Sequence, residues 1–277
     1  MVFPVKDIDE TQAPLLDHLL ELRTRLMRCI GALALAFAVC LYFANDILTI
    51  LVQPLLKAGQ NELIYTKLYE AFFVELKVAL FAAFFISFPI IANQLWAFVA
   101  PGLYAKEKKA FLPFLIATPV LFTTGASLAY FVVMPTAFKW FLGFEGMHGG
   151  LKVQAMPATG DYLSLVMQFI LAFGVSFLLP VLLMLLNRAG IVSRAQLAGA
   201  RRYVIVGITA LAAVITPPDV VSQLMLAIPL LFLFEGSLLM MRFTEARDAA
   251  EKAAEEAAQA VGQQVEGPTT DALPPPP

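Results

Sequence analysis

Charged residues are scarce in this chain. Asp, Glu, Lys and Arg make up 14% of its 277 residues, hydrophobic residues make up 60%, and the formal net charge is -2. Proteins that bind nucleic acids neutralise phosphates with an excess of clustered Lys and Arg. This balance of charge leaves no basic surface for that purpose, and so apolar a composition is typical of membrane proteins. We therefore expect lipid as a partner and no nucleic acid.

Motifs for catalysis and for cofactors are missing as well. The chain has two cysteines, two histidines and neither an HExxH nor a GxSxG pattern. Cys29 and Cys40 lie on one predicted helix, too far apart in height to bond each other, and we interpret them as packing residues. We interpret His18 and His148 as solvated or packing side chains. We expect no catalytic site, no metal site and no cofactor, so the protein is not an enzyme on this reading.

Long uncharged stretches dominate the chain. A helix needs about 20 apolar residues to cross a bilayer core of roughly 30 Å. Six stretches approach or exceed that length, at residues 29–45, 78–105, 110–138, 162–187, 203–218 and 220–234, the last continuing past Glu235 to residue 241. The predicted fold class is all-α, a polytopic membrane protein with six transmembrane helices.

The cations outside these stretches alternate between successive connections. Fourteen of the 19 Lys and Arg residues lie in the N-terminal segment, the second-to-third connection, the fourth-to-fifth connection and the C-terminal tail. Segments that stay in the cytoplasm carry an excess of Lys and Arg. The pattern predicts an N-in/C-in protein with both termini in the cytoplasm, which agrees with an even number of spans.

Three parts are expected along the chain. They are a cytoplasmic amphipathic arm at 1–28, a six-helix membrane domain at 29–241 and a cytoplasmic tail at 242–277 that is helical and then disordered. The two longer external connections, about 46–75 and 135–161, contain amphipathic patches, and we expect these to lie as caps along the outer interface.

The last two spans are predicted to be short. Only about fourteen residues separate Tyr203 from the Pro217-Pro218 pair, a rise of roughly 21 Å. The final stretch meets Glu235 before its end. We expect this hairpin to lie in thinned bilayer.

Short motifs follow one another in a fixed order. They are PLLDHLLELRTRL at 14–26, YFAN at 42–45, QLWAFVAPGLY at 94–104, KEKK at 106–109, FGVSF at 173–177 and TPPDVVSQ at 216–223. The first contains the pattern HLxELRxRL. Together, on a six-span frame, they resemble the TatC family, the multi-spanning subunit of the bacterial twin-arginine protein translocase, over roughly residues 12–245.

The resemblance implies a receptor in the bacterial cytoplasmic (inner) membrane. Such a receptor binds twin-arginine signal peptides, works in a homo- or hetero-oligomer with single-span TatA/TatB-type subunits, and exports folded proteins using the proton-motive force. It also implies that Glu21 and Glu107 form the cytoplasmic binding site. Carboxylates accept forked hydrogen bonds from Arg better than from Lys, which suits that role. The alternative is that Glu21 merely pairs with Arg25, and Glu107 with a neighbouring lysine.

Other roles implied by the resemblance concern single positions. Arg23 is expected to order the arm or offset the negative charge of the site, and Phe98 to shape the cytoplasmic turn. Pro54 and Asp219 match external positions that matter for coupling and partner contact. For Asp219, a simple N-cap of the last helix is the alternative reading.

One position departs from the family pattern. Leu178 stands where the family commonly has a glutamate or glutamine, and this removes a polar contact for a partner helix. Gln168 is predicted to lie one helix face away and some 15 Å along the axis, which makes it a poor substitute.

Two other functions stay open on the sequence. An ion-coupled transporter of a small solute would use Glu75, Glu235 or Gln168 as its membrane site, although no internal repeat is visible. An intramembrane protease is disfavoured because the chain lacks a nucleophile motif.

Overall fold

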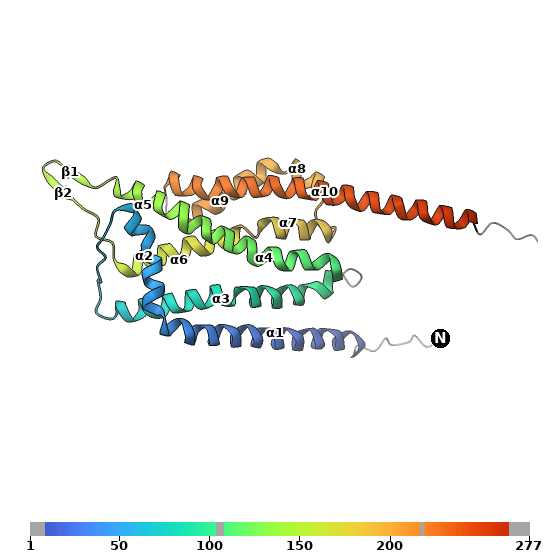
Figure 1. Ribbon diagram of the computed structural model, residues 1–277, viewed down its shortest axis with the longest axis horizontal. Coiled ribbons are helices and arrows are strands. Elements are labelled where there is room, and N and C mark those ends of the chain that lie inside the picture. Colours follow the sequence, from blue (N-terminus) through green and yellow to red (C-terminus); the bar gives the residue numbers. More distant parts are fainter. Residues whose placement is uncertain (1–8, 104–107, 217–218, 266–277) are drawn as a thin grey trace, which may run out of the picture.

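The computed structural model describes residues 9–103, 108–216 and 219–265 of the protein. Almost all of these residues are helical (Figure 1). In chain order the elements are α1 (Asp9–Tyr42), α2 (Ala44–Ala58), α3 (Glu70–Leu103), α4 (Lys108–Leu128), the π-helical turn η1 (Ala129–Val133), α5 (Met134–Leu142), β1 (Gly146–His148), β2 (Leu151–Val153), α6 (Thr159–Ser176), α7 (Leu179–Arg188), α8 (Arg194–Gly199), α9 (Arg201–Ile215) and α10 (Val220–Val265).

Within the described residues, five stretches of helix are long and apolar enough to cross a membrane. They are His18–Tyr42, Glu70–Phe98, Phe114–Leu142, Thr159–Arg188 and Val220–Ala246. The remaining apolar helix, α9, has 15 residues, and a helix of that length rises only about 22 Å, less than the roughly 30 Å of a bilayer core. The protein is thus a helical, multi-pass membrane protein with a short α9, as its length in the sequence predicts.

Two predicted boundaries do not coincide with helix ends. α1 runs from Asp9 to Tyr42, so the expected arm shares one helix with the first membrane stretch. α10 runs for 46 residues from Val220 to Val265, and the prediction of a short last helix is therefore wrong. Beyond residue 241 the chain continues with Ala, Glu and other helix formers and no Gly or Pro before residue 262, so nothing ends the helix where the apolar residues end.

The fourth predicted span is broken rather than continuous. α6 ends at Ser176 and α7 begins at Leu179. Pro180 has no backbone N–H to donate to the carbonyl of Ser176, and it stands in the first turn of α7, where that N–H would have no partner within the helix. The chain bridges the break with a bond from the backbone N–H of Leu178 to the carbonyl of Val175 at 3.0 Å.

Both longer connections predicted as caps contain short helices, α2 and α5, which contact each other. The backbone N–H of Thr159 donates to the carbonyl of Ile64 at 2.8 Å, which joins the two connections, and Ile64 pairs with Ala158 in a parallel bridge. The second connection also forms the antiparallel hairpin β1–β2, with Met147 opposite Lys152. The all-α prediction missed this hairpin.

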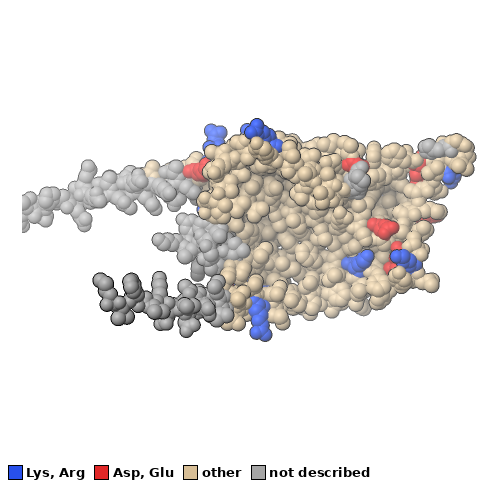
Figure 2. Space-filling model, turned by 180° about the vertical axis from the view of Figure 1, so that it is seen from behind, with Lys and Arg blue, Asp and Glu red and all other residues tan. Residues whose placement is uncertain are grey.

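The helix ends and the connections gather at two opposite ends of the bundle (Figure 1). The start of α1, the end of α3, the start of α4 and the C-terminal half of α10 lie at the right-hand end, whereas α2, α5 and the β1–β2 hairpin lie at the left. Charged side chains lie toward these two ends on the face shown in Figure 2, and the middle of that face is uncharged. An apolar band between two polar ends is what a bilayer requires of a spanning bundle.

The core is centred on α6. Phe169 and Phe173 on this helix are fully buried, and Leu230 and Phe234 of α10 are buried in the same cluster. α4 packs closely on α6, where Gly174 faces the ring of Phe122. By contrast, α1 packs chiefly on α3, away from this core.

Candidate functional site

The carboxylate of Glu21 lies on α1, near its N-terminal end, and is only partly buried. The guanidinium of Arg25, one helical turn later, donates to its Oε1 through Nε at 2.9 Å and also through Nη2. The Nδ1 of His18 lies 3.9 Å from the other carboxylate oxygen. Pairs at i,i+4 on a surface helix contribute about 0.3–0.5 kcal/mol. A second guanidinium can therefore displace Arg25 at little cost.

A ring stack joins α1 to α3 beside Glu21. The rings of His18 and Phe98 have centroids 4.3 Å apart and planes 15° from parallel. His18 is thus a packing residue, one of the two readings that the sequence left open. Its partner was not predictable, because 80 residues separate the two rings along the chain.

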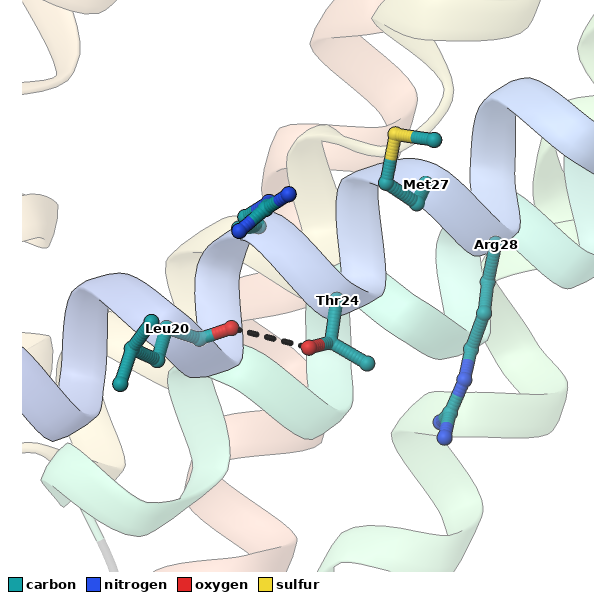
Figure 3. A pocket seen from close by; sticks show the side chains of 5 residues that line it. Leu20, Thr24, Met27 and Arg28 are labelled. Atoms are coloured by element: carbon teal, nitrogen blue, oxygen red, sulfur yellow. Dashed lines mark hydrogen bonds between the residues drawn. The ribbon is translucent and has the colours of Figure 1, made fainter.

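Arg23 lies on a different face of α1 from Glu21. It lines a shallow groove of about 440 Å³ with Leu20, Thr24, Met27 and Arg28, four of which are labelled in Figure 3. The hydroxyl of Thr24 donates to the carbonyl of Leu20 at 3.0 Å. All five residues belong to one helix, so this groove is open to the surroundings. Arg25, rather than Arg23, offsets the charge of Glu21.

Glu107 lies outside the described residues. The helices that flank it, α3 ending at Leu103 and α4 beginning at Lys108, meet at the end of the bundle where α1 starts (Figure 1). Its distance from Glu21 stays a prediction.

An apolar groove of about 1150 Å³ lies between the helices of the bundle. It is lined by residues of α3, α4, α6, α7 and α9, and of α10 through Leu230; Leu178, half-buried at the α6–α7 break, lies in its wall. Two of the few polar side chains there bond each other: Trp96 donates through Nε1 to the hydroxyl of Thr118 at 2.7 Å. The groove suits an apolar helix or acyl chain rather than an ion.

Gln168 lines the same groove as Leu178. Its amide Nε2 donates to the carbonyl of Ile215, at the end of α9, at 2.8 Å. The expectation that Gln168 is a poor substitute for a polar residue at position 178 stays a prediction.

Pro54 in α2 and Asp219 just before α10 lie at the end of the bundle opposite to the start of α1 (Figure 1). Pro54 is inside α2 and is buried. Oδ2 of Asp219 accepts a hydrogen bond from the backbone N–H of Ser222 at 2.6 Å, which is the N-cap geometry of the alternative reading. Its other oxygen, Oδ1, is buried without a partner among the described residues.

The side chains proposed for a transporter do not gather into one site. Glu235 forms an ion pair with Arg201, in which Oε2 lies 2.9 Å from Nη2. Gln168 donates a hydrogen bond to the carbonyl of Ile215. Glu75 is on α3 and makes no ion pair within the described part of the chain. The described residues contain no group of three His, Cys, Asp or Glu placed to hold a metal ion.

Comparison with known proteins decides the family. The model of the Sec-independent protein translocase protein (TatC) family matches residues 17–229. The chain belongs to the TatC family. A TatC protein of Magnetococcus marinus is 46% identical over 264 residues, covering 95% of this chain and 96% of the relative. The TatC protein of Escherichia coli (strain K12) is 41% identical over 238 residues, covering 85% and 90%.

A solved TatC structure shares the fold. The crystal structure of the twin-arginine translocase receptor TatC in DDM superposes with a TM-score of 0.71 at 39% identity, covering 80% of this chain and 98% of that one. The residues matched by the TatC model include Glu21, Pro54, Phe98, Leu178 and Asp219, whereas Glu235 lies beyond them. The resemblance in the sequence is therefore confirmed, while the roles of these residues stay predictions.

Proposed function

We propose that this chain is the receptor subunit of the twin-arginine protein translocase, and that Glu21 and Glu107 bind the arginine pair of a signal peptide. The observation that carries the proposal is the state of Glu21. It is a partly exposed carboxylate, beside a ring stack, whose present partner is already a guanidinium. A signal-peptide arginine needs only to exchange with Arg25 to make the same forked contact.

The exchange explains why two carboxylates are needed. Replacing one guanidinium with another at Glu21 leaves the number of ion pairs unchanged, so it gives little affinity by itself. A second acceptor at Glu107 adds a contact that the free receptor lacks. Phe98, stacked on His18, offers an aromatic face on which an arginine can also stack.

The wider setting follows from the same proposal. The chain has six membrane helices including the short α9, with the start of α1 and the end of α10 on the cytoplasmic side of the bacterial inner membrane. Residues 1–28 and 242–277 face the cytoplasm, and 29–241 form the membrane domain. Single-span TatA/TatB-type subunits are its partners, with contacts at Pro54, Asp219 and the groove around Leu178. The alternation of Lys and Arg between connections supports this orientation.

The proposal predicts the result of binding measurements. Loss of one charge-assisted contact costs about 1.5–3 kcal/mol, or roughly 10- to 150-fold in affinity. Glu107→Ala should weaken the binding of a twin-arginine signal peptide by that factor, and Glu21→Ala should weaken it by less, because a peptide arginine at Glu21 only replaces the existing contact with Arg25. A Lys-Lys peptide should bind the parent less well. Fluorescence anisotropy with a labelled peptide and the purified protein in detergent measures all three.

Glu62→Ala is the matched control, because Glu62 is exposed in the connection between α2 and α3 at the outer end. It should leave the affinity unchanged. If the double variant at 21 and 107 still distinguished Arg-Arg from Lys-Lys peptides as well as the parent does, the site assignment would be wrong even within the TatC family.

A further inference from the structure

A proline stands inside a well-packed helix at the outer end. α2 contains Pro54, which is buried together with Leu51 and Leu55 on the face turned to the bundle. A proline has no backbone N–H, so the carbonyl of Ile50, four residues earlier, lacks the donor that a regular α-helix would supply.

Two tyrosine hydroxyls donate to α2 at this point. The hydroxyl of Tyr130 donates to the carbonyl of Ile50 at 2.6 Å. The hydroxyl of Tyr162, on α6, donates to the carbonyl of Leu51 at 2.9 Å. The two acceptors differ in one respect. Leu55 has a backbone N–H to offer Leu51, whereas Pro54 has none to offer Ile50.

The backbone around Tyr130 is irregular too. Tyr130 belongs to η1, the π-helical turn between α4 and α5. A π-turn carries an extra residue within the turn and changes the direction of the side chains that follow, and such turns are frequent at functional positions. Pro54 thus leaves the Ile50 carbonyl of α2 without its helical donor. The π-helical turn lies at Tyr130, whose hydroxyl donates to that carbonyl instead.

We infer that Tyr130 is the positioning residue through which Pro54 acts: Pro54 leaves the Ile50 carbonyl without a helical donor, and the Tyr130 hydroxyl uses that carbonyl to fix α2 on the bundle. α2 follows α1 after only one residue, and α1 otherwise packs chiefly on α3. The bond therefore holds the outer end of α1 in place against the helices around α6. Where the chain acts as the proposed receptor, this links the helix that carries Glu21 to the outer cap.

A double-mutant cycle tests the inference. Hydrogen–deuterium exchange of the backbone amides of residues 47–58 is measured in purified protein in detergent, for the parent, Tyr130→Phe, Pro54→Ala and the double variant. Tyr130→Phe should speed exchange in the parent by about 5-fold or more, because the Ile50 carbonyl loses the hydroxyl that donates to it. In the Pro54→Ala background, residue 54 again supplies an N–H to Ile50, and Tyr130→Phe should change exchange less than 2-fold.

Tyr162→Phe is the control, because its acceptor has a helical donor whichever residue occupies position 54. Its effect should be the same in both backgrounds. An equal effect of Tyr130→Phe in both backgrounds, or none in the parent, overturns the inference. The measurement needs neither a signal peptide nor export, so its outcome is independent of whether Glu21 binds arginine.

Discussion

The crossing of α4 and α6 leaves no room for a side chain at Gly125. A Cβ there would lie 2.5 Å from the carbonyl oxygen of Phe173 and 2.7 Å from Cγ of Phe177, whereas ordinary contacts begin at 3.4 Å. Gly125→Ala therefore requires the helices to separate by roughly 0.9 Å, the difference between the first and last of these distances. The first of these atoms belongs to the backbone and the second to a buried side chain, so neither can swing into open space.

The expected loss of stability follows from two opposing effects. Overpacking a core costs about 1–3 kcal/mol, while Gly→Ala inside a helix contributes about 0.8–1 kcal/mol of stabilisation. Gly207 in α9 isolates the second effect, because a Cβ there would meet nothing within 4 Å. Gly125→Ala should thus be less stable than Gly207→Ala by about 1–3 kcal/mol.

The assay is unfolding of the purified protein by SDS titration in mixed micelles, followed by helical circular dichroism, with Gly207→Ala measured in parallel. Equal unfolding midpoints for the two variants would refute the reasoning, since they would mean that α4 and α6 do not approach as closely as the structure has them. A lower midpoint for Gly207→Ala would refute it as well.

Two further predictions concern the hairpin formed by α9 and α10 and the apolar groove around Leu178. Inserting four leucines after Leu211 lengthens α9 by about 6 Å, so the bonds at its two ends, Gln168 to Ile215 and Arg201 to Glu235, cannot both persist. We expect a stably inserted variant to lose export of a twin-arginine reporter protein, and export at the parental rate would contradict the requirement for a short α9. Leu178→Glu should leave basal export intact but change disulfide cross-linking between single-span subunits and a cysteine introduced at Leu182, an exposed residue of the same groove, because polar pairs between membrane helices contribute only about 0.6–2 kcal/mol. If no partner cross-links to the cysteine at 182 with either Leu or Glu at 178, partner docking in this groove is ruled out.

The elements that the sequence predicted well depend on local properties. The long uncharged stretches became long helices, and the amphipathic patches in the outer connections became α2 and α5. Helix termini were predicted less well. The charged tail of α10 continues the membrane helix without a break, because helix propensity does not distinguish a helix in lipid from one in water.

The candidate site shows the same division. The motif around Glu21 placed Arg25 one turn away, and this pair exists in the structure because i,i+4 neighbours are fixed by the helix alone. The stack of His18 on Phe98 and the bond from Gln168 to the carbonyl of Ile215 were not predictable. Each depends on how two helices are placed relative to each other.

The sequence by itself determined three things about this protein. It is a helical membrane protein, its Lys and Arg residues are concentrated in alternate connections, and its motifs place it in the TatC family. Only the tertiary structure decided which distant groups meet: the carbonyl left free by Pro54 receives the hydroxyl of Tyr130, 80 residues further along the chain. The physical reason is that length, charge and helical period are properties of neighbouring residues, whereas a hydrogen bond between distant residues requires each donor and acceptor to be brought within about 3 Å by the packing of whole helices.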